Sequence, residues 1–98
     1  MRTFEMPFHT TRGALEQTLV TLGYERTYEK NEFGFPIVAY RHCASGAYVA
    51  LRSVPAEEPL NPADLLSAEH SVEWWGLADR ETFYRHLREA TAPEALVA

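Results

Sequence analysis

Residues 35–54, FPIVAYRHCASGAYVALRSV, predict two β-strands joined by a tight turn. Residues 37–40 and 47–51 are dominated by β-branched, aromatic and small apolar side chains, which suit a pleated and half-buried surface. Between them, Ala44-Ser45-Gly46 supplies a glycine that adopts a positive φ without steric cost. Pro36 lacks a backbone donor and fits the start of the first strand, and Pro55 closes the second.

The second strand of this hairpin has two unlike faces, because successive side chains on a strand point in opposite directions. We assign the more apolar face to the core. The core face consists of Ala47, Val49 and Leu51, and the opposite face of Tyr48, Ala50 and Arg52.

A helix and a third strand are expected before the hairpin. Thr10 or Thr11 can cap the helix, and Gly23 ends it. The apolar side chains of this helix recur on one face and are Leu15, Leu19 and Leu22. Residues 24–29 then alternate, which indicates a strand with Tyr24, Arg26 and Tyr28 on one face. A turn over residues 30–34 leads into the hairpin.

Two further helices are expected after the hairpin. Asn61-Pro62-Ala63-Asp64 is a helix start, with Asn as the N-cap, Pro at the first position and an acid in the first turn. This helix ends near Glu69 or runs through Trp75, since residues 70–76 also alternate as a short strand would. Asp79 caps a last helix from Arg80 to about Ala90.

The two ends of the chain carry weaker patterns. Residues 1–8 alternate apolar and polar side chains, which predicts either an edge strand able to pair with a second copy or a loosely ordered terminus. Residues 91–98 are expected to form a flexible tail. The chain is therefore predicted to be a single α+β domain, residues 1–98 with a core over about 10–90. In it, helices pack on one face of a three-stranded antiparallel meander.

Composition narrows the class of protein. The 98 residues suit one small domain, and the net charge of −5 argues against a generic nucleic-acid binder without excluding a local basic patch. The single cysteine, Cys43, excludes an internal disulfide and fits a reducing compartment. No leader and no apolar run of membrane-spanning length is present, so we expect a cytoplasmic protein with no membrane span.

Several short sequence motifs, taken in order along the chain, resemble those of the HicA toxin family. They are Leu22-Gly23-Tyr24, Tyr40-Arg41-His42 followed by Ser45-Gly46, Val54-Pro55, Leu60-Asn61-Pro62, and Gly76-Leu77 with Phe83. The resemblance covers Gly13 to about Leu87. It implies a double-stranded-RNA-binding-domain-like αβββα fold and a place among small bacterial mRNA interferases of toxin–antitoxin systems.

The chain departs from this family at the catalytic position. The family's catalytic histidine stands in a Gly-Ser-His motif just before the segment that matches Tyr40-Arg41-His42. At that position this sequence has Phe35-Pro36-Ile37. The Ile37 side chain cannot act as a general acid or base. The family's toxins are also usually basic, whereas this chain is acidic. Both differences favour a domain that binds rather than cleaves.

Candidate catalytic residues are few. If the chain is an enzyme, the resemblance suggests a ribonuclease using His42 with Arg41 or Tyr40, but a structural role for His42 is the alternative. His42 and Cys43 point to opposite faces of a strand, so they do not readily share a metal. Glu69, His70 and Glu73 share a helix face only if that stretch is helical, and they lack a zinc signature. We expect a solvated acidic face there, with no metal and no cofactor.

Candidate binding residues lie in the last third of the chain. Trp74 and Trp75 either complete the core from two sides or form an interface, where tryptophan is enriched. Arg85 and Arg88 lie one turn apart and either contact RNA phosphates or form a solvated face.

The sequence thus predicts a small non-catalytic interaction domain that binds a protein partner or forms a homo-oligomer. The alternatives are a divergent mRNA interferase and an RNA-binding domain.

Overall fold

The fold is seen in a computed structural model that describes residues 8–30, 34 and 36–91. Its elements follow in the order α1 (Arg12–Thr21), β1 (Glu25–Lys30), β2 (Pro36–His42), β3 (Ala47–Arg52), α2 (Pro62–Trp74) and α3 (Arg80–Ala90). The predicted α+β class is therefore confirmed. Among the described residues, no helix is both long enough and apolar enough to cross a membrane.

The three strands form one antiparallel meander in the order β1-β2-β3. Tyr40 at the centre of β2 pairs with Arg26 on one side and with Val49 on the other. The predicted hairpin turn is present, with Gly46 at a φ of 86° and its N–H bonded to the His42 carbonyl at 2.8 Å. Buried and exposed residues alternate along β3 as expected, with Ala47, Val49 and Leu51 buried.

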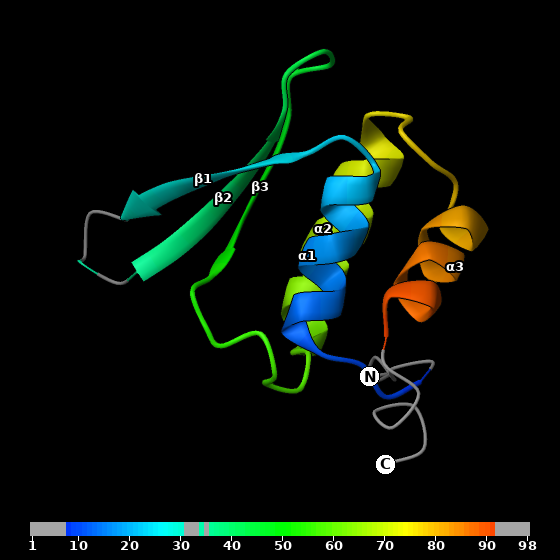
Figure 1. The fold of residues 1–98 in the computed structure, drawn as a ribbon. Helices are drawn as coiled ribbons and strands as arrows, with labels where there is room; N and C mark the ends of the chain where they lie inside the picture. Colours follow the sequence, from blue (N-terminus) through cyan, green and yellow to red (C-terminus); the bar gives the residue numbers. More distant parts are fainter. Residues whose placement is uncertain (1–7, 31–33, 35, 92–98) are drawn as a thin grey trace, which may run out of the picture.

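All three helices lie on the same side of the sheet (Figure 1). Helix α1 contacts β1 and α3, while α2 contacts β3 and α3. Helix α3 thus packs mainly on the other two helices and forms an outer layer. The core between these layers is built from side chains at most 6% exposed, among them Leu15, Leu19, Tyr24, Val38, Tyr40, Val49, Leu65, Val72, Phe83 and Leu87.

The helix ends follow the predicted capping residues. The side chains of Thr11, Asn61 and Asp79 accept hydrogen bonds from the first-turn amides of Ala14, Ala63 and Thr82. Helix α2 continues through Trp74, so residues 70–74 are helical and the short-strand alternative is wrong. These caps satisfy amides that have no partner within the helix.

The predicted strand over residues 1–8 and the predicted turn over 30–34 lie largely outside the described residues, as do residues 92–98 of the predicted tail. Thr91 differs from the expectation, because it is only 5% exposed. Its hydroxyl lies 2.7 Å from the Thr10 hydroxyl and donates to the Leu87 carbonyl at 2.7 Å. Thr91 therefore belongs to the packed domain, where it ties the end of α3 to the residues before α1.

Gly23 offers a test of how closely α1 approaches the hairpin. The φ of Gly23 is +100°, and a Cβ added to it would lie 2.8 Å from His42 Nε2. Gly76 also has a positive φ, of +67°, but a Cβ added there would meet nothing within 4 Å. We expect Gly76→Ala to lower the free energy of unfolding by about 1 kcal/mol through backbone strain alone. Gly23→Ala should cost at least about 1 kcal/mol more because of the added clash. Urea unfolding followed by circular dichroism measures both, and equal losses would contradict the predicted clash.

Candidate functional site

The two tryptophans lie outside the core. The buried face of α2 carries Leu65, Ala68 and Val72, and Trp74 follows Val72 by two positions, about 200° around the helix axis. Trp74 is consequently 75% exposed, and Trp75, the C-cap residue, is 46% exposed. The interpretation that both tryptophans complete the core is therefore wrong.

The exposed rings gather with two other aromatic side chains at the C-terminal end of α2. We call Tyr48, His70, Trp74 and Trp75 the aromatic surface. The His70 and Trp74 rings stack, with centroids 6.1 Å apart and an interplanar angle of 24°. Together with Ser67 and Ser71, the four residues line a cavity of about 250 Å³. This arrangement places flat, rigid rings around a hollow, which suits an apolar side chain of a partner.

A hydrogen-bonded serine fixes α2 against the edge of the sheet. Ser71 Oγ donates to the Tyr48 carbonyl of β3 at 3.2 Å and lies 2.8 Å from the Tyr24 hydroxyl. Ser71 and Tyr24 are buried, so the bond between them is shielded from water. The backbone beneath the aromatic surface is therefore held at both the helix and the strand.

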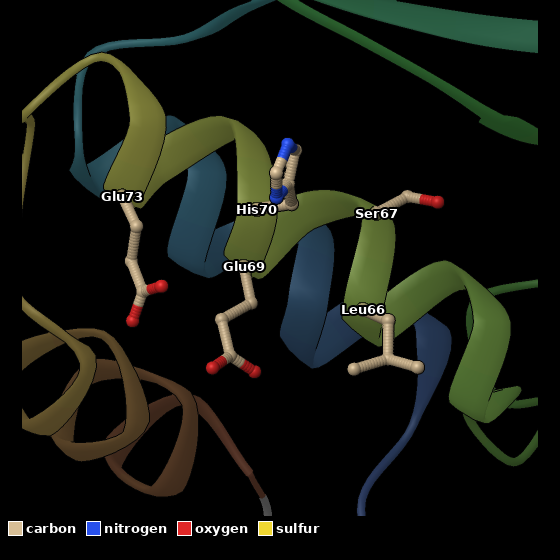
Figure 2. A pocket seen from close by; sticks show the side chains of 5 residues that line it. All are labelled: Leu66, Ser67, Glu69, His70 and Glu73. Carbon is tan, nitrogen blue, oxygen red and sulfur yellow. The ribbon is translucent and has the colours of Figure 1, made fainter. Parts of the chain in front are cut away.

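A second hollow, of about 550 Å³, lies beside the aromatic surface, and its described lining consists of five α2 residues: Leu66, Ser67, Glu69, His70 and Glu73 (Figure 2). Figure 2 shows Glu69 and Glu73 pointing away from the His70 ring, so the three do not converge on one point. In the described part of the chain, no three His, Cys, Asp or Glu side chains cluster so as to hold a metal ion. A hollow on one helix is an open surface rather than an enclosed reaction site.

The two acidic residues of this hollow differ in their pairing. Glu69 is only 8% exposed and accepts a hydrogen bond from the Tyr84 hydroxyl at 2.6 Å, while Arg80 Nε lies 3.3 Å away. Burial, with a further contribution from Glu69, raises the pKa of Tyr84 well above its usual range. Glu73 is exposed and forms no ion pair with any described residue. Glu73 therefore remains an available negative charge next to the tryptophans.

The three candidate catalytic residues do not share one face of the sheet. His42 and Tyr40 point toward the helices, whereas Arg41 between them is exposed. The His42 and Tyr24 rings are T-shaped with centroids 5.8 Å apart, and His42 Nδ1 accepts a hydrogen bond from the Ser45 N–H at 3.2 Å. His42 thus holds the hairpin turn, and the three side chains form no common reaction centre.

Tyr40 belongs instead to a polar network that the sequence did not indicate. Its hydroxyl donates to Glu16 Oε1 at 2.8 Å and accepts from Arg12 Nη2 at 3.1 Å, and Glu16 also pairs with Arg26 at 3.2 Å. Burial raises the pKa of Tyr40, so the phenol stays neutral near pH 7. The one available signal was the spacing of Arg12 and Glu16, which lie one helical turn apart.

The candidate RNA contacts lie on a separate surface. Arg85 and Arg88 line a cavity of about 350 Å³ with Phe8, Glu81 and Tyr84, and the Arg88 guanidinium lies 4.3 Å from the centroid of the Phe8 ring. They share no cavity with Trp74 or Trp75 among those described. The structure therefore divides the predicted binding residues into two groups.

Comparison with known proteins finds no matching family model, no similar curated protein and no similar solved structure. The chemistry of the surface must therefore be interpreted from its own residues.

Three tyrosines give the domain a predicted sensitivity to alkali. Burial raises the pKa of Tyr24, Tyr40 and Tyr84 above the ordinary value of 10.0. Their contribution to stability is present below that value and is lost as the pH rises, because the unfolded chain releases these protons more readily. We expect the free energy of unfolding in urea to begin to fall near about pH 10 and to keep falling as the pH rises toward the raised pKa values of the folded protein. Tyr24→Phe should make this fall smaller, and an unchanged slope would contradict the assignment.

Proposed function

We propose that this protein is a non-catalytic interaction domain that binds a protein partner through the aromatic surface. The observation that carries the proposal is the 75% exposure of Trp74 on a well-formed helix. A large exposed apolar ring leaves a hydrophobic contribution unused, worth about 25 cal/mol for each Å² that a partner would cover. Tryptophans placed around a hollow are also typical of binding hot spots.

Charge favours a partner different from the chain itself. Glu73 borders the hollow on α2 and also a cavity of about 420 Å³ that Asp79 and Arg80 help to line. A symmetric contact between two copies sets the same patch against itself and would bring these acidic groups together. A chain with a net charge of −5 also repels its copies. The surface instead suits an apolar side chain flanked by basic residues.

The proposed place of this domain is a HicA-like fold in a toxin–antitoxin-type system. The order of elements, a helix, three antiparallel strands and two helices, supports the fold implied by the sequence resemblance. Ile37, at the position of the family's histidine, is a half-buried residue of β2 that offers no titratable group. This residue supports binding rather than cleavage.

The test compares Trp74→Ala with Val20→Ala, which removes an exposed apolar side chain from α1. Each purified variant and the wild type would be immobilised and exposed to a cell extract. The proteins that each one retains would then be quantified by mass spectrometry. We expect a protein retained by the wild type and by Val20→Ala to be lost with Trp74→Ala. With that protein purified, calorimetry should show a loss of about 2 kcal/mol in binding free energy.

Two outcomes would contradict this proposal. Sedimentation of the wild type as a dimer that Trp74→Ala disrupts would make a second copy the occupant of the surface. Retention of the same proteins, or of RNA, by the wild type and both variants would remove the tryptophans from function. In the RNA case, Arg85 and Arg88 would be the next residues to replace.

A further inference from the structure

Arg12 is a buried cation whose hydrogen-bonding capacity is largely unused. The residue is only 4% exposed, although it stands at the first position of α1. Its Nη2 donates to the Tyr40 hydroxyl at 3.1 Å, while its buried Nε has no hydrogen-bond partner among the described residues. No carboxylate of the described chain lies within 4.0 Å of its guanidinium. A buried guanidinium without a counter-charge is costly, so this position needs an explanation.

The neighbouring acid does not supply that counter-charge alone. Glu16 Oε1 accepts a hydrogen bond from the Tyr40 hydroxyl at 2.8 Å and pairs with Arg26 Nη1 at 3.2 Å. The cluster therefore holds two arginines but one carboxylate, which leaves one positive charge uncompensated. An anion that binds at this point would balance the cluster.

A cavity of the right size opens at this cluster. It measures about 150 Å³ and is lined by Arg12, Gly13, Glu16, Arg26, Val38, Tyr40, Val54 and Ala56. An apolar cavity of about that volume holds a benzene ring, so this polar one has room for an acid group of four or five heavy atoms. Arg26, with a side chain 58% exposed, lies at the edge of the cluster and is accessible to solvent.

The loop before α2 forms a rigid wall of this cavity. The amides of Arg12 and Gly13 donate to the carbonyls of Glu58 and Ala56 at 2.9 and 2.8 Å. A Cβ on Gly13 would lie 3.0 Å from Ala56 Cβ, so glycine permits this close approach. Because these first-turn amides are already bonded, the guanidinium groups rather than the helix terminus would hold a ligand.

We propose that this cavity binds a small oxyanion group, a carboxylate or a phosphate, held by the guanidinium groups of Arg12 and Arg26. Guanidinium groups present paired N–H donors that match the oxygens of both acid groups. The bound group neutralises the excess positive charge of the cluster. This binding is independent of the aromatic surface and of the protein partner proposed for it.

The experiment follows the Arg12 Nε–H signal in ¹H–¹⁵N spectra of the intact chain during titration with sodium phosphate or sodium acetate. Sodium chloride at matched ionic strength is the reference, and Arg12→Lys identifies the signal by removing it. We expect a saturable shift with phosphate or acetate, and the arm with the lower dissociation constant identifies the acid group. A shift that grows linearly, or equally with chloride, would overturn the proposal.

A pair of variants separates this site from a general effect of surface charge. Arg26→Gln removes the cavity arginine paired with Glu16 at 3.2 Å, while Arg80→Gln removes a similarly exposed arginine paired with Glu69 at 3.3 Å. Arg26→Gln should weaken binding about tenfold, the effect of losing one charge-assisted hydrogen bond, and Arg80→Gln should leave it unchanged. Equal affinities in the wild type and both variants would also overturn the proposal.

Discussion

The two-sidedness of β3 is the constraint on which the rest of the domain depends. One face of β3 is buried and consists of Ala47, Val49 and Leu51, whose apolar side chains are stabilised by removal from water. The opposite face carries Tyr48 and Arg52, which are exposed. Since only one face of the sheet is apolar enough to be covered, all three helices lie on that side (Figure 1). Helix α3 completes the burial by packing on α1 and α2 rather than mainly on the sheet.

This arrangement determines what the surface can offer. Helix α2 packs along β3, and Ser71 bonds to the β3 backbone, so the outward rings of α2 lie beside Tyr48. The aromatic surface therefore rests on a helix and a strand that the Ser71 hydrogen bond joins. Such a rigid support would lower the entropic cost of the proposed binding, because few side chains would have to be ordered when a partner arrives.

The polar network under α1 shows a different use of the same core. Tyr40 stands at the centre of the middle strand, and its hydroxyl joins Arg12 and Glu16 of α1 at a position that is otherwise apolar. Such a network fixes how the helix sits on the sheet, but it leaves a charge imbalance next to a cavity. The aromatic surface and the cavity are thus separate features, one lined mainly by aromatic rings and the other in part by charged side chains.

The sequence by itself determined the α+β class, the hairpin, the core face of β3 and the caps of α2 and α3, and it narrowed the cap of α1 to Thr10 or Thr11. Each of these follows from local rules: the alternation of side chains on a strand, the φ of Gly46, and the hydrogen-bonding geometry of Thr11, Asn61 and Asp79. Only the tertiary structure decided that Trp74 points to solvent, that Thr91 is buried and that Arg12 is buried against Tyr40. These outcomes depend on which elements pack together. Residues far apart in the chain create those environments, and no local pattern records them.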